Sequence, residues 1–171
     1  MYENLVYLKV GGGLRSVSKL QIANSINPLN AFVIYSSAFV FCAIGKWEDG
    51  MRLWEQALSL NPHPPPIYFM VPFMNHYHQG DYEAAWNYAK QLNAPMLWNP
   101  LFRAAAAGQL GFQNQAKTAL QELLVMRPDF PFRARNLMHR LIYSKESVKK
   151  LLDGLFKAGL KLKSGRVNCK A

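Results

Sequence analysis

A six-residue stretch that opens on glycine recurs three times in the middle of the chain. GKWEDG at residues 45–50 aligns with GDYEAA at 80–85 and with GFQNQA at 111–116, at spacings of 35 and 31 residues. Each copy follows an apolar segment and precedes a second segment with helical periodicity. A repeat of two helices at this spacing is typical of an α-helical array, in which stacked hairpins share one core.

The glycine has the same expected role in each copy. Because glycine enters the left-handed conformation without steric cost, it can end one helix and begin the turn to the next. In the first full copy an apolar helix is expected over 31–44 before Gly45, and an amphipathic helix over 48–60 after it. Asn61 and Pro62 then end the second helix, since the residue before a proline avoids the α conformation.

These residues resemble the tetratricopeptide repeat, whose pattern has small residues where paired helices cross, a glycine at the turn and a closing proline. With Gly45, Gly80 and Gly111 at the turn, the first and third copies follow the pattern, while the middle copy has Phe73 at a small-residue position and lacks the closing proline. The matching positions are Ala38, Phe41, Gly50, Trp54, Ala57 and Pro62 in the first copy, Tyr82 and Ala85 in the second, and Ala104, Ala116, Leu120 and Pro128 in the third.

The resemblance implies an all-α fold, a right-handed α-solenoid of helical hairpins closed by C-terminal capping helices. Its expected divisions are an array over 1–128 (a degenerate unit at 1–28 and units at 29–62, 63–94 and 95–128), capping helices over 129–160 and a basic flexible tail over 161–171. The ending resembles the region that follows class III nucleotide-cyclase or winged-helix transcription-regulator domains in bacterial proteins. A regulatory segment of such a signalling protein is therefore a second functional hypothesis.

In this family the first helix of each hairpin lines the concave surface. The resemblance therefore implies an apolar partner-binding groove made of Phe32, Tyr35, Phe39, Met70, Met74, Tyr77, His78, Trp98 and Leu101. Exposed apolar grooves mark interaction sites, so the leading expectation is a non-enzymatic scaffold that binds a peptide or helix of another protein. Two alternatives remain open: the chain's own C-terminal helices or a second copy fill the groove, or a small molecule binds there.

Positive charge is concentrated in the last quarter of the chain. Residues 1–129 carry nine basic and eight acidic side chains, whereas residues 130–171 carry eleven and two. The candidate basic patch consists of Arg133, Arg135, Arg140, Lys149 and Lys150. Basic residues beside aromatic ones can bind nucleic acid or another anionic surface, which is a third hypothesis. A solvated face on a capping helix explains the same composition, and the resemblance favours that interpretation.

The sequence predicts no catalytic constellation, metal site or cofactor. His76 and His78 are two residues apart, which places them on different faces of a helix rather than at the spacing of metal ligands. Cys42 and Cys169 have neither the spacing of a zinc site nor that of a disulfide framework.

Pro72 lies inside an apolar segment of the middle copy. If the helix starts near Pro66, the proline removes a backbone hydrogen bond and kinks it, which is the interpretation we prefer. If the helix starts near Phe69, Pro72 falls in its first turn and does no harm.

No membrane span is predicted. The longest apolar run, residues 31–44, has fourteen residues, whereas a span needs about twenty. The N-terminal segment does not resemble a signal peptide. We therefore expect a cytoplasmic protein, with homo-oligomerisation left open.

Overall fold

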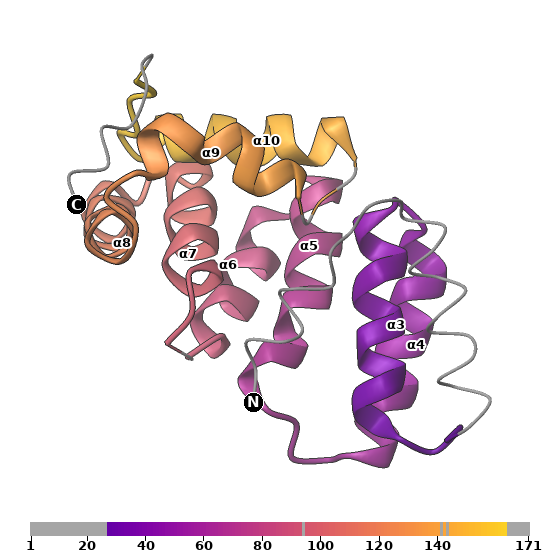
Figure 1. Ribbon diagram of the computed structural model, residues 1–171. Coiled ribbons are helices and arrows are strands. Elements are labelled where there is room, and N and C mark those ends of the chain that lie inside the picture. Colours follow the sequence, from indigo (N-terminus) through magenta and orange to yellow (C-terminus); the bar gives the residue numbers. More distant parts are fainter. Residues whose placement is uncertain (1–26, 94, 141, 143, 164–171) are drawn as a thin grey trace, which may run out of the picture.

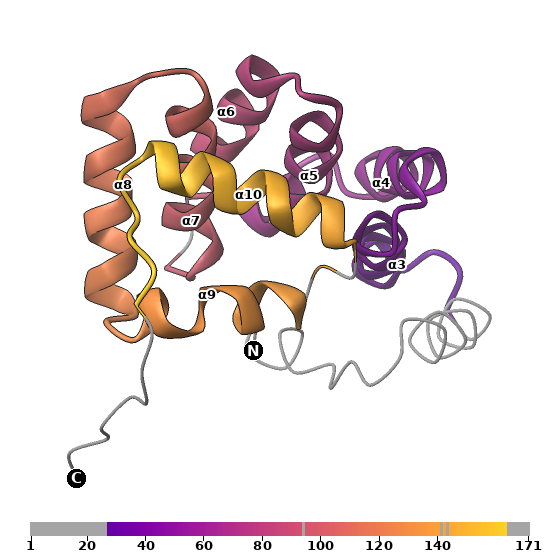
Figure 2. The same ribbon diagram turned by 90° about the horizontal axis from the view of Figure 1, so that it is seen from above.

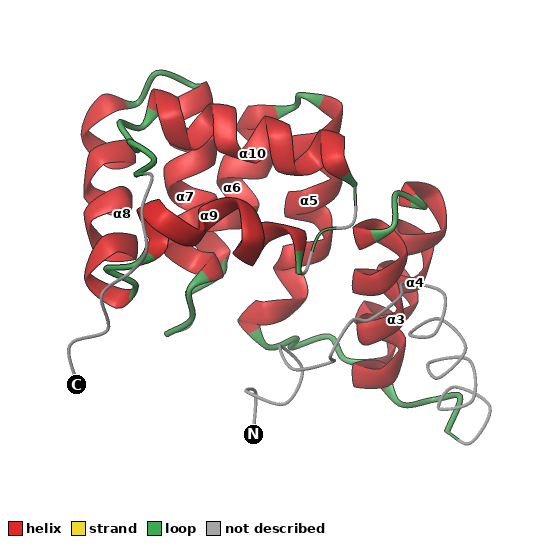
Figure 3. Cartoon of the chain, turned by 45° about the horizontal axis from the view of Figure 1, so that its top comes forward, coloured by secondary structure: helices red, strands yellow, loops and turns green. Residues whose placement is uncertain are grey.

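The computed structural model describes residues 27–163 except 94, 141 and 143 (Figure 1). The expected degenerate unit at 1–28 and the basic tail at 161–171 thus lie mostly outside the described residues. The described part of the chain is all-helical and contains no strand (Figure 3). Its elements are α3 (Ala31–Ala43), α4 (Trp47–Leu60), the 3-10 helix η1 (Pro66–Phe69), α5 (Met70–Gln79), α6 (Tyr82–Gln91), α7 (Trp98–Gln109), α8 (Gln113–Met126), α9 (Phe130–His139) and α10 (Lys145–Lys157).

The helices from α3 to α8 form three hairpins that follow one another in chain order. The pairs α3–α4, α5–α6 and α7–α8 pack against each other, and neighbouring hairpins meet through α4–α5, α3–α5 and α6–α7. Figures 1 and 2 show the same progression from α3 at one side of the molecule to α8 at the other. Each hairpin coincides with one copy of the sequence repeat.

The three turn glycines adopt the conformation that the sequence predicts. Gly45, Gly80 and Gly111 have φ of 90°, 86° and 72°. In each turn the N–H of the next residue donates to the carbonyl five residues earlier, at 2.8 Å for Lys46 to Phe41 and 2.9 Å for Phe112 to Ala107. This is the Schellman arrangement, which satisfies carbonyls that the helix end leaves open.

Small residues at the helix crossings are needed for close approach within a hairpin. Gly50 of α4 packs on α3 so tightly that an added Cβ would overlap the Cys42 sulfur and lie 3.1 Å from the Ala38 carbonyl oxygen. Ala57 on the same face of α4 is fully buried. The third hairpin has buried alanines at its own crossing, Ala104 and Ala116. A larger side chain at these positions would push the two helices apart.

The last two helices form a layer over one side of the hairpins. α10 packs on α7 and beside α9, and Figure 2 shows it crossing α7 and α5. Its buried stripe of Val148, Leu151, Leu152 and Leu155 joins the same core as the hairpins. Ser144 caps the start of α10 by accepting a 3.2 Å hydrogen bond from the Ser147 N–H. Two helices therefore occur in the range where the sequence predicts C-terminal helices, and the buried stripe on α10 is part of the core.

The expected kink at Pro72 is wrong. A 3-10 turn over Pro66–Phe69 precedes α5, which begins at Met70. Pro72 is then the third residue of α5, in the first turn, where helical N–H groups have no intrahelical acceptor. Its missing N–H therefore removes no helical hydrogen bond.

The most apolar helix is short and largely buried. α3 has thirteen residues, eight of them buried. Among residues 27–163, with the gaps named above, no helix combines the length and hydropathy that crossing a bilayer requires.

Candidate functional site

Most residues of the expected groove are buried in the core. Six of the nine are at most 5 % exposed: Tyr35, Met70, Met74, Tyr77, Trp98 and Leu101. The expectation that these six side chains line an open groove is corrected by their burial. Tyr35 of α3 is buried against the 3-10 turn that precedes α5: it stacks on Tyr68 with ring centroids 4.2 Å apart, and its hydroxyl donates to the Ile67 carbonyl at 2.7 Å.

Over α5 and α7, the chain's own α10 takes the place that we assigned to a partner. The Tyr77 hydroxyl lies between the two neighbouring helices, 3.4 Å from the Ala105 carbonyl oxygen of α7 and 3.2 Å from the Lys150 carbonyl oxygen of α10. Burial raises the pKa of Tyr77, so its hydroxyl stays protonated and donates. The sequence left open whether a partner, a second copy or the chain's own C-terminal helices cover this surface. Over α5 and α7 it is a C-terminal helix, α10, that covers it.

Two glycines allow α10 to approach this surface at backbone distance. An added Cβ at Gly154 of α10 would overlap the Tyr77 hydroxyl and the Ala105 carbonyl. An added Cβ at Gly108 of α7 would overlap the Gly154 carbonyl. Sequence reasoning missed this contact, although its signal was a glycine within each of two amphipathic helices, where glycine lowers helix stability unless packing requires it.

Polar contacts fix α10 on the hairpins at several points. Gln109 donates to the Asp153 carboxylate at 3.0 Å and accepts from the Lys157 ammonium at 2.7 Å. Lys157 also pairs with Asp153 at 2.8 Å. The hydrogen bonds from Lys157 and Gln109 hold the pKa of Asp153 below its ordinary value. These contacts join the end of α7 to the outer face of α10.

A second set of contacts lies where α10 begins, at the boundary between the first two hairpins. The His78 ring stacks on Trp47 with centroids 4.3 Å apart, and its Nδ1 is 3.4 Å from the Ser147 hydroxyl. Lys150 donates to the His78 carbonyl at 2.6 Å. Burial, and after it the Lys150 charge, lower the pKa of His78, while Glu146 opposes the shift.

The space left at this boundary is too small for a ligand. A cavity of about 10 Å³ remains there, which is at the lower limit for one water molecule. Its lining is Trp47, Phe73, Met74, Tyr77, His78, Ile142, Ser147 and Leu151. Three of the predicted groove residues, Met74, Tyr77 and His78, are thus together here, but they enclose no small-molecule pocket.

Beyond the start of α10, part of the predicted groove stays accessible. Phe32 is 36 % exposed and Phe39 is half-buried, seven residues apart on α3. His78, at the end of α5, is half-buried as well. Phe32 and Phe39 therefore form the exposed remainder of the groove, which we call the α3 seat.

The predicted basic patch is exposed except at one position. Arg133, Arg135, Arg140 and Lys149 are solvent-accessible. Lys150 is partly buried, pairs with Glu146 at 3.0 Å and serves the contact to His78, so it belongs to the attachment of α10. Further exposed cations that the prediction did not include are Lys145, Lys157, Lys161 and Lys163.

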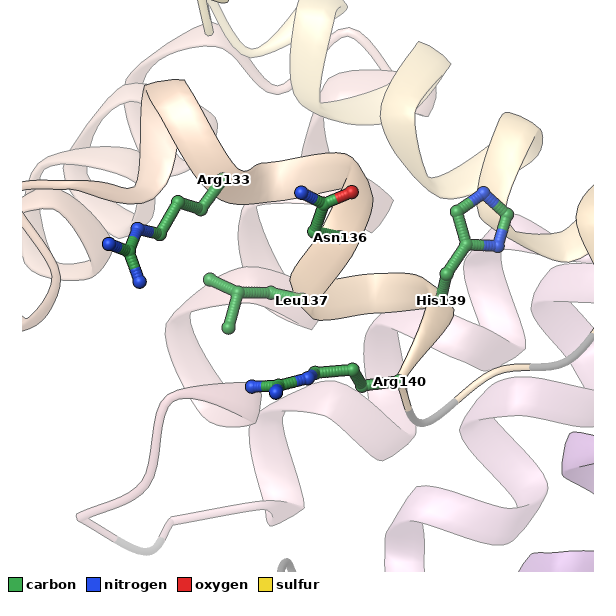
Figure 4. Close-up of a pocket in the computed structure, with 5 residues that line it drawn as sticks. All are labelled: Arg133, Asn136, Leu137, His139 and Arg140. Carbon is green, nitrogen blue, oxygen red and sulfur yellow. The ribbon is translucent and has the colours of Figure 1, made fainter. Parts of the chain in front are cut away.

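The basic patch contains a cavity on α9. Its volume is about 440 Å³, and it is lined by Arg133, Asn136, Leu137, His139 and Arg140. Figure 4 shows Arg133, Leu137 and Arg140 extending to the same side of the helix. We call this the α9 pocket.

The two histidines of the middle copy have separate packing roles. His76 lies 3.1 Å from the Asp81 carboxylate and stacks near Tyr88, whereas His78 faces Trp47. No group of three or more His, Cys, Asp or Glu side chains arranged for a metal ion occurs in the part of the chain that the structure describes. Cys42 is buried, and burial raises the pKa of its thiol to about 12.

The arrangement can therefore hold a helix against the hairpins and can present a cationic layer with a pocket. The helix-holding surface is built from α5 and α7, and the cationic layer from α9 and α10. No protein-family model and no curated protein matches the chain.

Proposed function

We propose that this protein is a non-enzymatic scaffold for protein–protein interaction. Its hairpins would form a tetratricopeptide-like, right-handed α-solenoid that holds amphipathic helices on its inner face. The observation that carries the proposal is α10 itself, an amphipathic helix with a buried leucine stripe that packs on α7 and reaches α5 at Tyr77 (Figure 2). The surface formed by α5 and α7 thus already receives a helix of defined chemistry within the same chain.

The α3 seat is the place where a helix of a partner protein would dock. α10 begins beside Trp47 and His78, at the boundary of the first two hairpins. The seat lies on α3, in the first of these hairpins, where α10 does not cover it. Phe32 and Phe39 are one heptad apart, which matches the repeat of apolar residues on one face of a helix. The partner would therefore be an amphipathic helix with leucine or aromatic residues along one face, similar to α10.

The contribution of Phe32 and Phe39 to the affinity for a partner helix can be bounded. Complete burial of a phenylalanine stabilises a contact by about 1.5–3 kcal/mol. Since Phe32 is already about two-thirds covered, at 36 % exposed, only part of that remains to be gained. A charge at either position adds an unfavourable desolvation, so a double substitution should weaken binding at least tenfold.

The test uses crosslinking followed by a quantitative affinity measurement. A photoreactive amino acid at position 32 of the full chain identifies the partner in the native host, and the same group at position 117 on α8 is the control. The purified partner is then titrated against the parent chain, Phe32→Glu/Phe39→Glu and Val125→Glu, the last altering an 81 % exposed apolar residue on α8. Unchanged affinity of the double variant, with a normal helical circular-dichroism spectrum, would refute the seat.

A cytoplasmic setting forms part of the proposal. Its support is the wide separation of the two cysteines and the burial of the Cys42 thiol. Both features suit a reducing compartment.

A further inference from the structure

Among the described residues, the excess of positive charge lies on one layer of the fold. Residues 127–163 carry ten basic and three acidic side chains, while residues 27–126 carry five and six. All three acids of the first set are already paired: Asp129 with Arg127 and Arg133, Glu146 with Lys150, and Asp153 with Lys157. Within the described ranges, six cations of this layer have no acidic partner within ion-pair distance: Arg135, Arg140, Lys145, Lys149, Lys161 and Lys163.

These cations come from three segments that lie together. α9 and α10 pack side by side over the hairpins (Figure 2). The segment after α10 returns along α9, where the Lys163 N–H donates to the Pro131 carbonyl at 3.0 Å. The Lys163 ammonium lies 5.7 Å from the centroid of Phe132, a ring that is 36 % exposed. The layer therefore combines unpaired cations with an accessible aromatic ring.

The α9 pocket gives this layer a specific site. Arg133, Leu137 and Arg140 are spaced by four and three residues, so they share one helix face (Figure 4), and the two arginine backbones are roughly 10 Å apart along the axis. Leu137 is half-buried and supplies an apolar floor between the two guanidinium groups. Asn136 and His139 add an amide and an imidazole at the rim.

We propose that this layer binds single-stranded nucleic acid, with one nucleotide seated in the α9 pocket. Guanidinium groups bind phosphate oxygens through two parallel hydrogen bonds, so Arg133 and Arg140 would contact successive stretches of backbone. Leu137 offers a surface for the face of a base, and the Asn136 amide can both donate to and accept from a base edge. The volume of about 440 Å³ is in the range of small-ligand sites.

A single strand fits this surface better than the other polyanions. A base must leave its stack to enter a pocket, which a single strand permits at little energetic cost and a duplex does not. An anionic membrane surface attracts the same cations, but an interfacial helix also inserts a continuous apolar face, which strengthens its attachment. The exposed large apolar side chains of α9 and α10 are only Phe132 and Phe156, on different helices.

The number of unpaired cations sets the expected salt dependence. If six of them each neutralise one phosphate, the slope of log K against log salt is about −4 for a single strand. Binding should then weaken roughly 300-fold between 50 and 200 mM salt. Arg133 can add a contact to these six, because its partner Asp129 is also paired with Arg127. Removing two phosphate contacts, those of Arg133 and Arg140, should reduce the magnitude of the slope by about 1.4 and weaken binding about 25-fold at 0.1 M salt.

The experiment is a fluorescence-anisotropy titration of the full chain with a labelled oligouridylate of about 12 nucleotides, a length within the usual site size. The test variant is Arg133→Gln/Arg140→Gln, and the matched control is Lys90→Gln/Lys117→Gln, which removes the same charge from the exposed faces of α6 and α8. Asn136→Asp places a carboxylate in the pocket at another exposed position and serves as an independent second variant.

We expect the arginine variant and Asn136→Asp to weaken binding at least tenfold and the lysine control to stay within twofold of the parent chain. If the arginine variant and the lysine control weaken binding equally, the α9 pocket is not the binding site, and the binding is a nonspecific attraction to the net charge of the protein. Salt-independent binding, no saturable binding at 50 mM salt, or tighter binding to duplex or to phosphatidylserine vesicles would overturn the proposal altogether. Should the arginine variant fail to fold, the Asn136→Asp titration decides the result.

Discussion

Replacement of Gly154 by alanine tests how α10 is held. The added methyl group would overlap the Tyr77 hydroxyl and the Ala105 carbonyl. The carbonyl belongs to the backbone of α7, so it cannot make room without a shift of that helix relative to α10. Overpacking of this kind costs about 1–3 kcal/mol. In an exposed helix the same change would stabilise the protein by up to about 1 kcal/mol, because alanine favours helix. The sign of the effect therefore distinguishes a packed glycine from an exposed one.

We expect the steric effect to exceed the gain in helix propensity. α10 must then shift away from α7, which loosens the burial of Leu151 and Leu155 and weakens the contacts of Gln109. A net loss of about 1–2 kcal/mol in a domain of this size lowers the melting temperature by about 2–8 °C. The shift should also expose the peptide bonds of α10 to protease, since local opening precedes cleavage.

The measurement is thermal and urea unfolding followed by circular dichroism, together with limited proteolysis. Lys149→Ala is the matched control, because it introduces alanine on the exposed face of the same helix, where the change should stay within about 0.5 kcal/mol. A Gly154→Ala protein that melts at a higher temperature than the parent, with α10 no more sensitive to protease, would show that α10 does not contact α7 through its backbone.

Three further outcomes follow from the same geometry. Tyr77→Phe removes a buried hydroxyl placed between two carbonyl oxygens, so urea unfolding should show a loss of about 1 kcal/mol. Gly111→Ala introduces a Cβ at φ of 72° and should cost about 1–2 kcal/mol, whereas a gain in urea stability would contradict the left-handed turn. The lowered pKa of His78 means that the unfolded chain binds its proton more readily than the folded one. Stability should therefore fall as pH drops through about 6.5, and the parent chain should lose more than His78→Gln between neutral pH and pH 5; equal losses would refute the role of His78.

The positions of the three hairpins could be predicted from the sequence because local signals specify them. Gly45, Gly80 and Gly111 mark the turns, and each left-handed conformation depends on the glycine itself rather than on distant contacts. The spacing of small residues along the helices likewise predicts that Gly50 and Ala57 lie where α4 packs on α3. These elements need no knowledge of which other part of the chain packs against them.

The covering of α5 and α7 by α10 could not be predicted in the same way. Periodicity shows that Met74 and Tyr77 lie on an apolar face, but it does not say whether α10, a partner or solvent contacts that face. Periodicity leaves the partner of the apolar stripe on α10 equally open. Only the joint presence of Gly108 in α7 and Gly154 in α10 indicates that these two helices are in contact. The start of α5 was misjudged for a related reason, because a 3-10 turn and a helix have similar apolar spacing over four residues.

The position of α10 in the chain has a consequence for biosynthesis. The ribosome completes all three hairpins before it makes the helix that covers α5 and α7. Until then, the nascent protein presents Met74 and Tyr77 to the cell without their final neighbour, which is the kind of transient apolar exposure that chaperones recognise. Messages that end early, before residue 145, would encode a product with this surface permanently uncovered, and such a product should be removed by quality control rather than accumulate.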